Sequence, residues 1–174
     1  MTARLRVAVV TVSDRSFRGE REDRSGPAVA AAVRRLLAPV EIVASPCLPD
    51  ERETLAEALR ALADGDAADL VLTTGGTGLA PRDVTPEATR DVVEREVPGL
   101  AEAMRAAGRA ALPAAMLSRQ VAGVRGRTLV VNLPGSPRGA AEGLEAVAPA
   151  LRHAVATLRG EAGDDHPAPA GLTA

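Results

Sequence analysis

Short aliphatic runs alternate along the chain with longer segments in which apolar residues recur every three or four positions. The compact runs at residues 5–12, 40–44, 69–74 and 128–132 predict strands, because β-branched residues fill stretches too short for helices. The periodic segments predict helices over residues 25–38, 51–63, 85–96 and 100–107, and from 137 to about 158. Residues 13–26 and 108–124 fit neither pattern.

The alternation of strands and helices predicts an α/β fold with a mostly parallel sheet that is covered on both faces. Ligands bind such sheets beyond the carboxyl ends of the strands. Four loops should lie at that edge, formed by residues 13–26, 46–50, 75–83 and 132–138. The polar residues that need an explanation are concentrated in these loops, so we expect the functional site there.

The totals are those of an ordinary globular chain. Its 174 residues fit one domain, and 46% of them are hydrophobic and 25% charged. After Gly160 the composition shifts to Gly, Asp, Pro and Ala, so we predict a domain over residues 1–159 and a disordered tail over 160–174. The net charge of −2 gives no reason to expect nucleic acid as a partner. No apolar run is long enough to cross a membrane, and the single cysteine, Cys47, favours a reducing, cytoplasmic location.

All 21 basic residues are arginine, and Phe17 is the only aromatic residue. The absence of lysine excludes a Schiff base, a pyridoxal-phosphate anchor and a Walker-type phosphate lysine. A single ring also argues against binding of single-stranded nucleic acid by base stacking. Any phosphate site must therefore use backbone N–H groups, arginine or a metal ion.

The segment Gly75-Gly76-Thr77-Gly78 follows a predicted strand and has no bulky side chain. Backbone N–H groups can approach an anion closely there, and the Thr77 hydroxyl adds a donor. The alternative is a tight turn in which glycine provides a positive φ. Arg82 and Asp83 follow a few residues later. In one interpretation the guanidinium binds phosphate and the carboxylate binds magnesium; in the other the two residues form only a surface ion pair.

Asp50 also follows a strand and directly precedes a helix, so it is either a second metal ligand or a helix N-cap. Ser13, Asp14 and Asn132 end strands as either ligand contacts or turn residues. The rigid turn Pro134-Gly135-Ser136 is a candidate second anion site, with Ser136 and Arg138 as donors. Ser118-Arg119 is a polar pair in an apolar stretch, which either reaches the site or lies on a solvated face.

Five ordered segments together resemble the MogA/MoaB family of molybdenum-cofactor biosynthesis proteins. They read VTVSD at residues 10–14, DRSG at 23–26, TTGGTG at 73–78, PRDVTPEAT at 81–89 and NLPGSP at 132–137. The likeness extends from about residue 5 to 158. It implies a three-layer αβα sandwich that assembles as a homotrimer or a larger homo-oligomer.

The resemblance also implies a reaction, the transfer of AMP from Mg-ATP to molybdopterin with release of pyrophosphate. Asp50 and Asp83 match the family's catalytic carboxylates, which act through Mg²⁺. The binding positions that the resemblance implies are Ser13, Asp14, Gly75, Gly76, Thr77, Gly78, Asn132, Gly135 and Ser136, to which we add Ser118. Arg82, Pro134 and Arg138, inferred from the loop residues themselves, complete the candidate substrate-binding set. A molybdate-insertion protein is an implied partner. The alternative is a MoaB-like protein that binds the pterin or a partner without transferring AMP.

Overall fold

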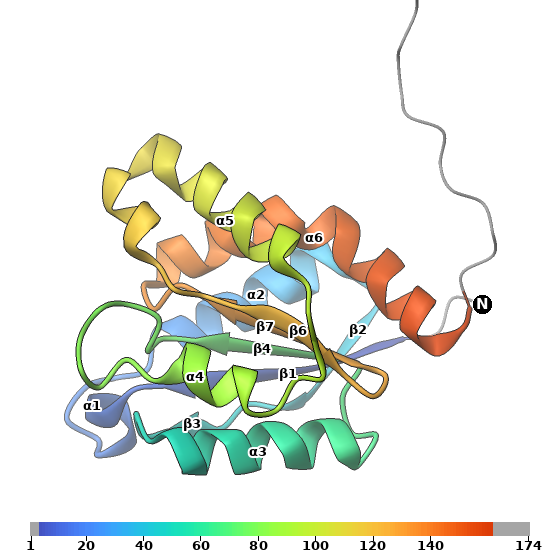
Figure 1. The fold of residues 1–174 in the computed structure, drawn as a ribbon, viewed down its shortest axis with the longest axis horizontal. Coiled ribbons are helices and arrows are strands. Elements are labelled where there is room, and N and C mark those ends of the chain that lie inside the picture. The colour runs from blue at the N-terminus through green and yellow to red at the C-terminus, as the bar shows by residue number, and fades with distance from the viewer. Residues whose placement is uncertain (1–3, 162–174) are drawn as a thin grey trace, which may run out of the picture.

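The computed structural model describes residues 4–161 and contains one seven-stranded sheet between two layers of helices (Figure 1). Its elements are β1 (Leu5–Val12), α1 (Asp14–Phe17), α2 (Ser25–Leu36), β2 (Val40–Ala44), β3 (Cys47–Leu48), α3 (Arg52–Asp64), β4 (Leu70–Thr74), α4 (Thr85–Arg90), β5 (Arg95–Glu96), α5 (Pro98–Ala111), the 3-10 helix η1 (Pro113–Leu117), β6 (Ala122–Arg125), β7 (Thr128–Leu133) and α6 (Pro137–Arg159).

The sheet has the order β2-β1-β4-β7-β6-β5, and β3 pairs with β1. Strands β1, β2, β3, β4 and β7 are parallel to one another, whereas β6 is antiparallel to β7 and β5 is antiparallel to β6. Helices α2, α5 and α6 cover one face, and α3 and α4 cover the other (Figure 1). This arrangement confirms the predicted αβα sandwich with a mostly parallel sheet.

Strand β1 shows why its sequence is apolar at nearly every position. Val7 and Val9 face the α2 and α6 layer, whereas Ala8 and Val10 face the α3 and α4 layer, and all four are buried. A strand with helices on both faces has no side exposed to water, so its sequence does not alternate. The central strands end level with one another, since Thr11 pairs with Thr74 on β4.

Two predicted helices have different bounds in the structure. The helix expected over 85–96 ends at Arg90, because the chain then turns and pairs with the edge of the sheet. There the Glu94 N–H donates to Val124 and the Val97 N–H to Ala122, and β5 lies between these two bonds. The helix expected over 100–107 is longer, since α5 begins at Pro98.

The irregular stretches contain short elements that the pattern did not predict. Residues 13–26 include α1, residues 46–50 include β3, and residues 108–124 include η1 and the start of β6. No helix within residues 4–161 has the length and apolar character needed to cross a membrane. The proposed tail lies almost entirely outside the described residues.

Candidate active site

The four predicted loops meet at the carboxyl edge of the sheet, and hydrogen bonds join them. Thr74 Oγ1 donates to the Pro134 carbonyl at 2.7 Å, which ties the end of β4 to the turn after β7. Ser25 Oγ donates to the Gly135 carbonyl at 2.7 Å, which ties the start of α2 to the same turn. Gly135 packs so closely on Gly75 that an added Cβ would lie 3.1 Å from the Gly75 Cα.

Asp14 and Asp50 join the first two loops through a reciprocal pair of bonds. The Asp14 N–H donates to Asp50 Oδ2 at 2.7 Å, and the Asp50 N–H donates to Asp14 Oδ1 at 3.0 Å. Asp50 does not cap α3, because Glu51 occupies the N-cap position. Ser13 does cap a helix, since its hydroxyl accepts the Ser16 N–H at the start of α1.

The glycine loop lies against both candidate catalytic carboxylates. A Cβ added at Gly76 would lie 3.1 Å from Asp50 Oδ1, and one added at Gly78 would lie 2.8 Å from Asp83 Oδ2. Gly75 and Gly76 have φ values of 104° and 64°, which disfavour residues with a side chain. The sequence of residues 75–78 is interpreted either as a tight turn that needs glycine or as an anion-binding loop. Both interpretations apply, because the turn that needs glycine also brings the backbone close to the two carboxylates.

The N–H groups of this loop are available to a ligand. The backbone N–H groups of Gly76, Thr77, Gly78 and Leu79 donate to no acceptor within residues 4–161. The Thr77 hydroxyl likewise donates to no acceptor within residues 4–161, although Thr77 is only 6% exposed. Successive unpaired N–H groups form a concave site of positive potential that suits phosphate oxygens.

Opposing effects act on the acidic groups. Burial raises the pKa of Asp50, and the negative charges of Asp14 and Asp83 raise it further. Burial would also raise the pKa of Asp14, but the Arg82 guanidinium and the Asp50 backbone lower it below its ordinary value. The site thus gathers more negative charge around Asp50 than the nearby arginine offsets.

The two arginines predicted to bind phosphate have protein partners. Arg82 donates from Nε and Nη2 to the two carboxylate oxygens of Asp14, at 2.9 and 2.8 Å. Arg138 lies at the start of α6 and donates from Nε to Glu142 at 2.6 Å. Both are well exposed, with 59% and 82% of their side-chain surfaces accessible, so exchange of these partners for a phosphate is sterically open.

Asn132 is placed differently from the sequence prediction. Its side chain is fully buried, and its amide donates to Thr73 Oγ1 and Thr89 Oγ1 at 3.0 and 2.8 Å. Its Oδ1 accepts the N–H of Val121 at 3.1 Å. The amide is thus satisfied within the protein and joins β4, α4 and the start of β6 beneath the site, so it offers a ligand no direct contact.

Arg119 is a residue of the site whose importance the sequence did not reveal. It donates from Nε to the Gly78 carbonyl at 2.7 Å and from Nη2 to the Asp83 carbonyl at 2.6 Å. The only sequence signal was its position in a polar pair within an apolar stretch. Its neighbour Ser118 donates instead to Gln120 Oε1 at 3.1 Å.

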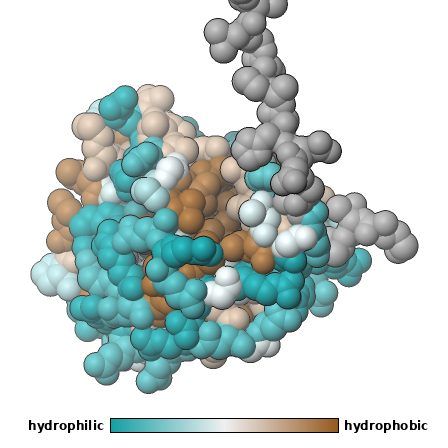
Figure 2. All heavy atoms as spheres, turned by 45° about the vertical axis from the view of Figure 1, so that its right-hand side comes forward, coloured by the Kyte–Doolittle hydropathy of each residue, from teal (hydrophilic) through white to brown (hydrophobic). Residues whose placement is uncertain are grey.

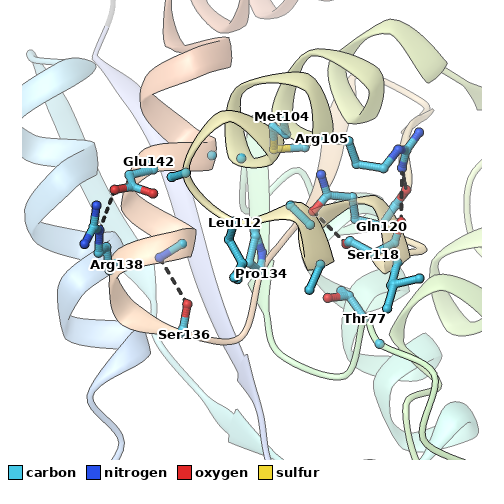
Figure 3. Close-up of a pocket in the computed structure, with 18 residues that line it drawn as sticks. Thr77, Met104, Arg105, Leu112, Ser118, Gln120, Pro134, Ser136, Arg138 and Glu142 are labelled. Atoms are coloured by element: carbon cyan, nitrogen blue, oxygen red, sulfur yellow. Dashed lines mark hydrogen bonds and ion pairs between the residues drawn. The ribbon is translucent and has the colours of Figure 1, made fainter.

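A cavity of about 480 Å³ lies beside the glycine loop, between α5, η1 and the start of α6 (Figure 3). Most of its wall is aliphatic, with Met104, Leu112 and Pro134 among the lining residues. Thr77 and Ser118 lie on one side of it, whereas Ser136, Arg138 and Glu142 lie on the other (Figure 3). The volume lies in the range of pockets that bind small organic molecules.

The donor set is consistent with a magnesium ion that arrives with a phosphate substrate. Within residues 4–161 no group of three or more His, Cys, Asp or Glu side chains is placed to hold a metal. Asp50 Oδ1 and Asp83 Oδ1 nevertheless have no hydrogen-bond partner in this range. Mg²⁺ typically binds one or two carboxylates and completes its coordination with substrate phosphates and water.

Together, the sheet edge, the open backbone N–H groups and the paired carboxylates define an α/β protein built to bind a phosphorylated small molecule. A family model described as "Probable molybdopterin binding domain" matches residues 8–153. The chain therefore belongs to this family of molybdenum-cofactor biosynthesis proteins.

Relatives of known name support this assignment. A molybdopterin adenylyltransferase of Helicobacter pylori strain J99 is 42% identical over 157 residues, which cover 90% of this chain and 89% of the relative. The crystal structure of the molybdopterin biosynthesis enzyme MoaB from Thermus thermophilus is 56% identical, with a TM-score of 0.81, and the match covers 90% of this chain and 97% of that one. A structure of MogA is 38% identical with a TM-score of 0.82, and the match covers 88% of this chain and 99% of that one.

Proposed function

We propose that this protein transfers AMP from ATP to molybdopterin in an Mg²⁺-dependent reaction. An oxygen of the terminal phosphate of molybdopterin attacks the α-phosphorus of ATP, and the bond from that phosphorus to the β-phosphate oxygen breaks. The products are adenylyl-molybdopterin and pyrophosphate. The observation that carries the proposal is the contact of Asp50 and Asp83 with a loop of unpaired N–H groups.

Such a transfer requires positioning and charge neutralisation more than a protein nucleophile. The N–H groups of Gly76, Thr77 and Gly78 would bind phosphate oxygens. Asp50 and Asp83 would hold the magnesium ion through their open oxygens, and this ion supplies charge neutralisation between the two anionic substrates. The raised pKa of Asp50 fits this role, since a nearby cation would relieve the repulsion among its acidic neighbours.

The cavity beside Thr77 would hold the flat ring system of one substrate against its aliphatic wall. Thr77 and Gly78 line the cavity, and Gly78 also lies against Asp83. A ring seated there would therefore direct its phosphate over the glycine loop toward the two carboxylates. Ser118 and Ser136 line the same cavity. The Ser118 hydroxyl donates to Gln120 and could still accept a bond from a ligand, whereas the Ser136 hydroxyl accepts the Gly139 N–H and could still donate one.

The test incubates the purified protein with molybdopterin and Mg-ATP and measures adenylylated pterin and pyrophosphate. Asp83→Asn should abolish turnover while the fold and pterin binding are kept, because the charged carboxylate is needed to hold the magnesium ion and not for packing. Near-normal turnover in this variant would contradict the role of Asp83. Pterin binding without any product would support the alternative, a MoaB-like protein that binds the pterin without transferring AMP.

We further propose that the protein acts in the cytoplasm as a homotrimer or larger homo-oligomer and passes its product to a molybdate-insertion protein. Leu112, Met116 and Leu117 support self-assembly, since each is more than half exposed on the surface around the cavity. Apolar residues also gather between hydrophilic ones on the face shown in Figure 2. Light scattering coupled to size-exclusion chromatography measures the assembly, and a monomeric mass would contradict it.

A further inference from the structure

Arg119 binds three successive parts of the active-site loop. Its backbone N–H donates to the Thr77 carbonyl at 2.9 Å, its Nε to the Gly78 carbonyl at 2.7 Å, and its Nη2 to the Asp83 carbonyl at 2.6 Å. The guanidinium also forms an ion pair with Glu87 in the first turn of α4. One residue thus connects the start of the loop, its end and the helix that follows.

We propose that Arg119 is a positioning residue that orients the phosphate-binding N–H groups and the Asp83 carboxylate. This inference rests on the function proposed above. A trans peptide is planar, with its C=O and N–H groups pointing in opposite directions. When the carbonyls of Thr77 and Gly78 point toward Arg119, the N–H groups of Gly78 and Leu79 must therefore point away from it. These are two of the N–H groups that donate to no acceptor within residues 4–161.

Asp83 is fixed from two sides. Its backbone carbonyl accepts from Arg119, while its Oδ2 accepts the Ala80 N–H at 2.8 Å. The residues between these contacts, positions 79–82, are exposed, and their other link to the domain is the pair of bonds from Arg82 to Asp14. Without the Arg119 side chain the loop would keep its local turn and this exposed ion pair but lose the bonds that hold the Gly78 and Asp83 carbonyls.

The chemistry of arginine suits this task better than that of lysine. The guanidinium is a planar fork with donors in fixed directions, and here it serves two carbonyls and a carboxylate at once. The Arg119 side chain is 34% exposed and that of Glu87 is 32% exposed, so the fork works in a partly desolvated setting. A lysine would keep the charge but could not place donors on Gly78 and Asp83 together.

The experiment compares Arg119→Lys and Arg119→Ala with a matched control, Arg125→Ala. Arg125 also bridges a carboxylate and a carbonyl, since it donates to Asp64 at 2.6 Å and to the Val92 carbonyl at 3.1 Å, but neither acceptor belongs to a loop of the site. We expect kcat/KM for ATP to fall about 100-fold in Arg119→Ala and about tenfold in Arg119→Lys, as for the loss of preorganised donors. The control should keep wild-type kcat/KM.

Thermal unfolding separates positioning from general stability. Arg119→Lys and Arg125→Ala should have similar unfolding midpoints, so a kinetic defect confined to position 119 would show that the loop geometry is affected. Turnover of Arg119→Lys within twofold of wild type would overturn the inference. So would an equal loss of turnover in Arg125→Ala.

A binding measurement distinguishes failure of this inference from failure of the proposed reaction. In protein labelled with ¹⁵N-glycine, magnesium pyrophosphate should shift the Gly76 and Gly78 amide signals of the wild type, and Arg119→Lys should weaken this binding about tenfold. If the wild type makes no adenylylated pterin but shows these shifts and their dependence on Arg119, the positioning role stands and the proposed reaction fails. Equal affinity in the wild type and Arg119→Lys would overturn the positioning role.

Discussion

Asp69 lies at the opposite edge of the sheet from the active site, where it joins β1, β4 and the end of α6. Its carboxylate accepts the Arg6 N–H at 2.7 Å and Arg6 Nη2 at 2.9 Å, and it pairs with the Arg159 guanidinium. The Asp69 side chain is only 5% exposed and that of Arg159 12%. We predict that Asp69→Asn destabilises the fold strongly but leaves the catalytic rate of the folded protein unchanged.

The magnitude follows from the pKa of Asp69. Burial alone would raise it, but the bonds from Arg159 and Arg6 outweigh burial and lower it from 3.8 to about 2. Since one pKa unit corresponds to about 1.4 kcal/mol, the ionised carboxylate contributes about 2 kcal/mol. The folded-state pKa is the lower one, so this stability is complete above the unfolded value of 3.8 and is lost as the pH falls toward 2. The Asn variant also leaves two guanidiniums facing a neutral amide, so about 3 kcal/mol should be lost at pH 7.

Urea unfolding followed by circular dichroism provides the assay, because the chain has no tryptophan or tyrosine for fluorescence. All variants must be compared at one protein concentration, since assembly would add to the apparent stability. Asp66→Asn is the matched control, because Asp66 also binds Arg6 but its side chain is 76% exposed. The control should change the free energy of unfolding by less than about 1 kcal/mol. An equal effect of both substitutions, or the same acid-induced loss in Asp69→Asn and wild type, would refute the reasoning.

Three further predictions concern the site itself. Gly78→Ala should lower turnover at least tenfold with little loss of stability, because the added Cβ would displace the Asp83 carboxylate. Gly99→Ala is the control in the same kinetic assay, since a Cβ added at Gly99 would have no neighbouring atom within 4 Å. Asp83→Asn should lower the pKa of Asp50 by removing a neighbouring negative charge, as measured by carbon NMR of the carboxyl groups; an unchanged pKa would contradict this. Asn132→Ala should cost about 3 kcal/mol in urea unfolding by leaving the Val121 N–H without its acceptor, and a loss below about 1 kcal/mol would contradict the structural role.

The sequence predicted the central architecture because the relevant signal is local. The strands at 5–12 and 70–74 are mostly aliphatic runs, and their burial on both faces is what such runs indicate, whereas the edge strand at 40–44 is only partly buried. The antiparallel edge was not predictable in this way. Strand β5 has two exposed residues, Arg95 and Glu96, and exists because their backbone pairs with β6. No local pattern encodes that partner.

For the candidate site, the sequence predicted that four loops lie at the carboxyl edge of the sheet, where the structure places them, but not the contacts within them. Asp50 and Asp14 are 36 positions apart, and only the fold reveals that each carboxylate accepts the other's N–H. Asn132 has the same appearance in sequence whether it faces a ligand or lies beneath the sheet edge. Arg119 is 36 positions from the carbonyl of Asp83 that it binds, so its role depends on the fold bringing the segment after η1 to the loop.

The absence of lysine changes meaning once the arginine contacts are known. A guanidinium can donate several bonds in fixed directions to carboxylates and carbonyls. Arg82 and Arg119 each donate more than one bond to protein acceptors, and Arg138 donates a single bond to Glu142. If these arginines keep their protein partners, phosphate binding falls to backbone N–H groups, which carry no full charge. The carboxylates of Asp50 and Asp83 then add to the negative charge that two phosphorylated substrates bring. We therefore predict that the proposed reaction needs a divalent cation, so that removal of Mg²⁺ with EDTA should abolish turnover while molybdopterin binding persists.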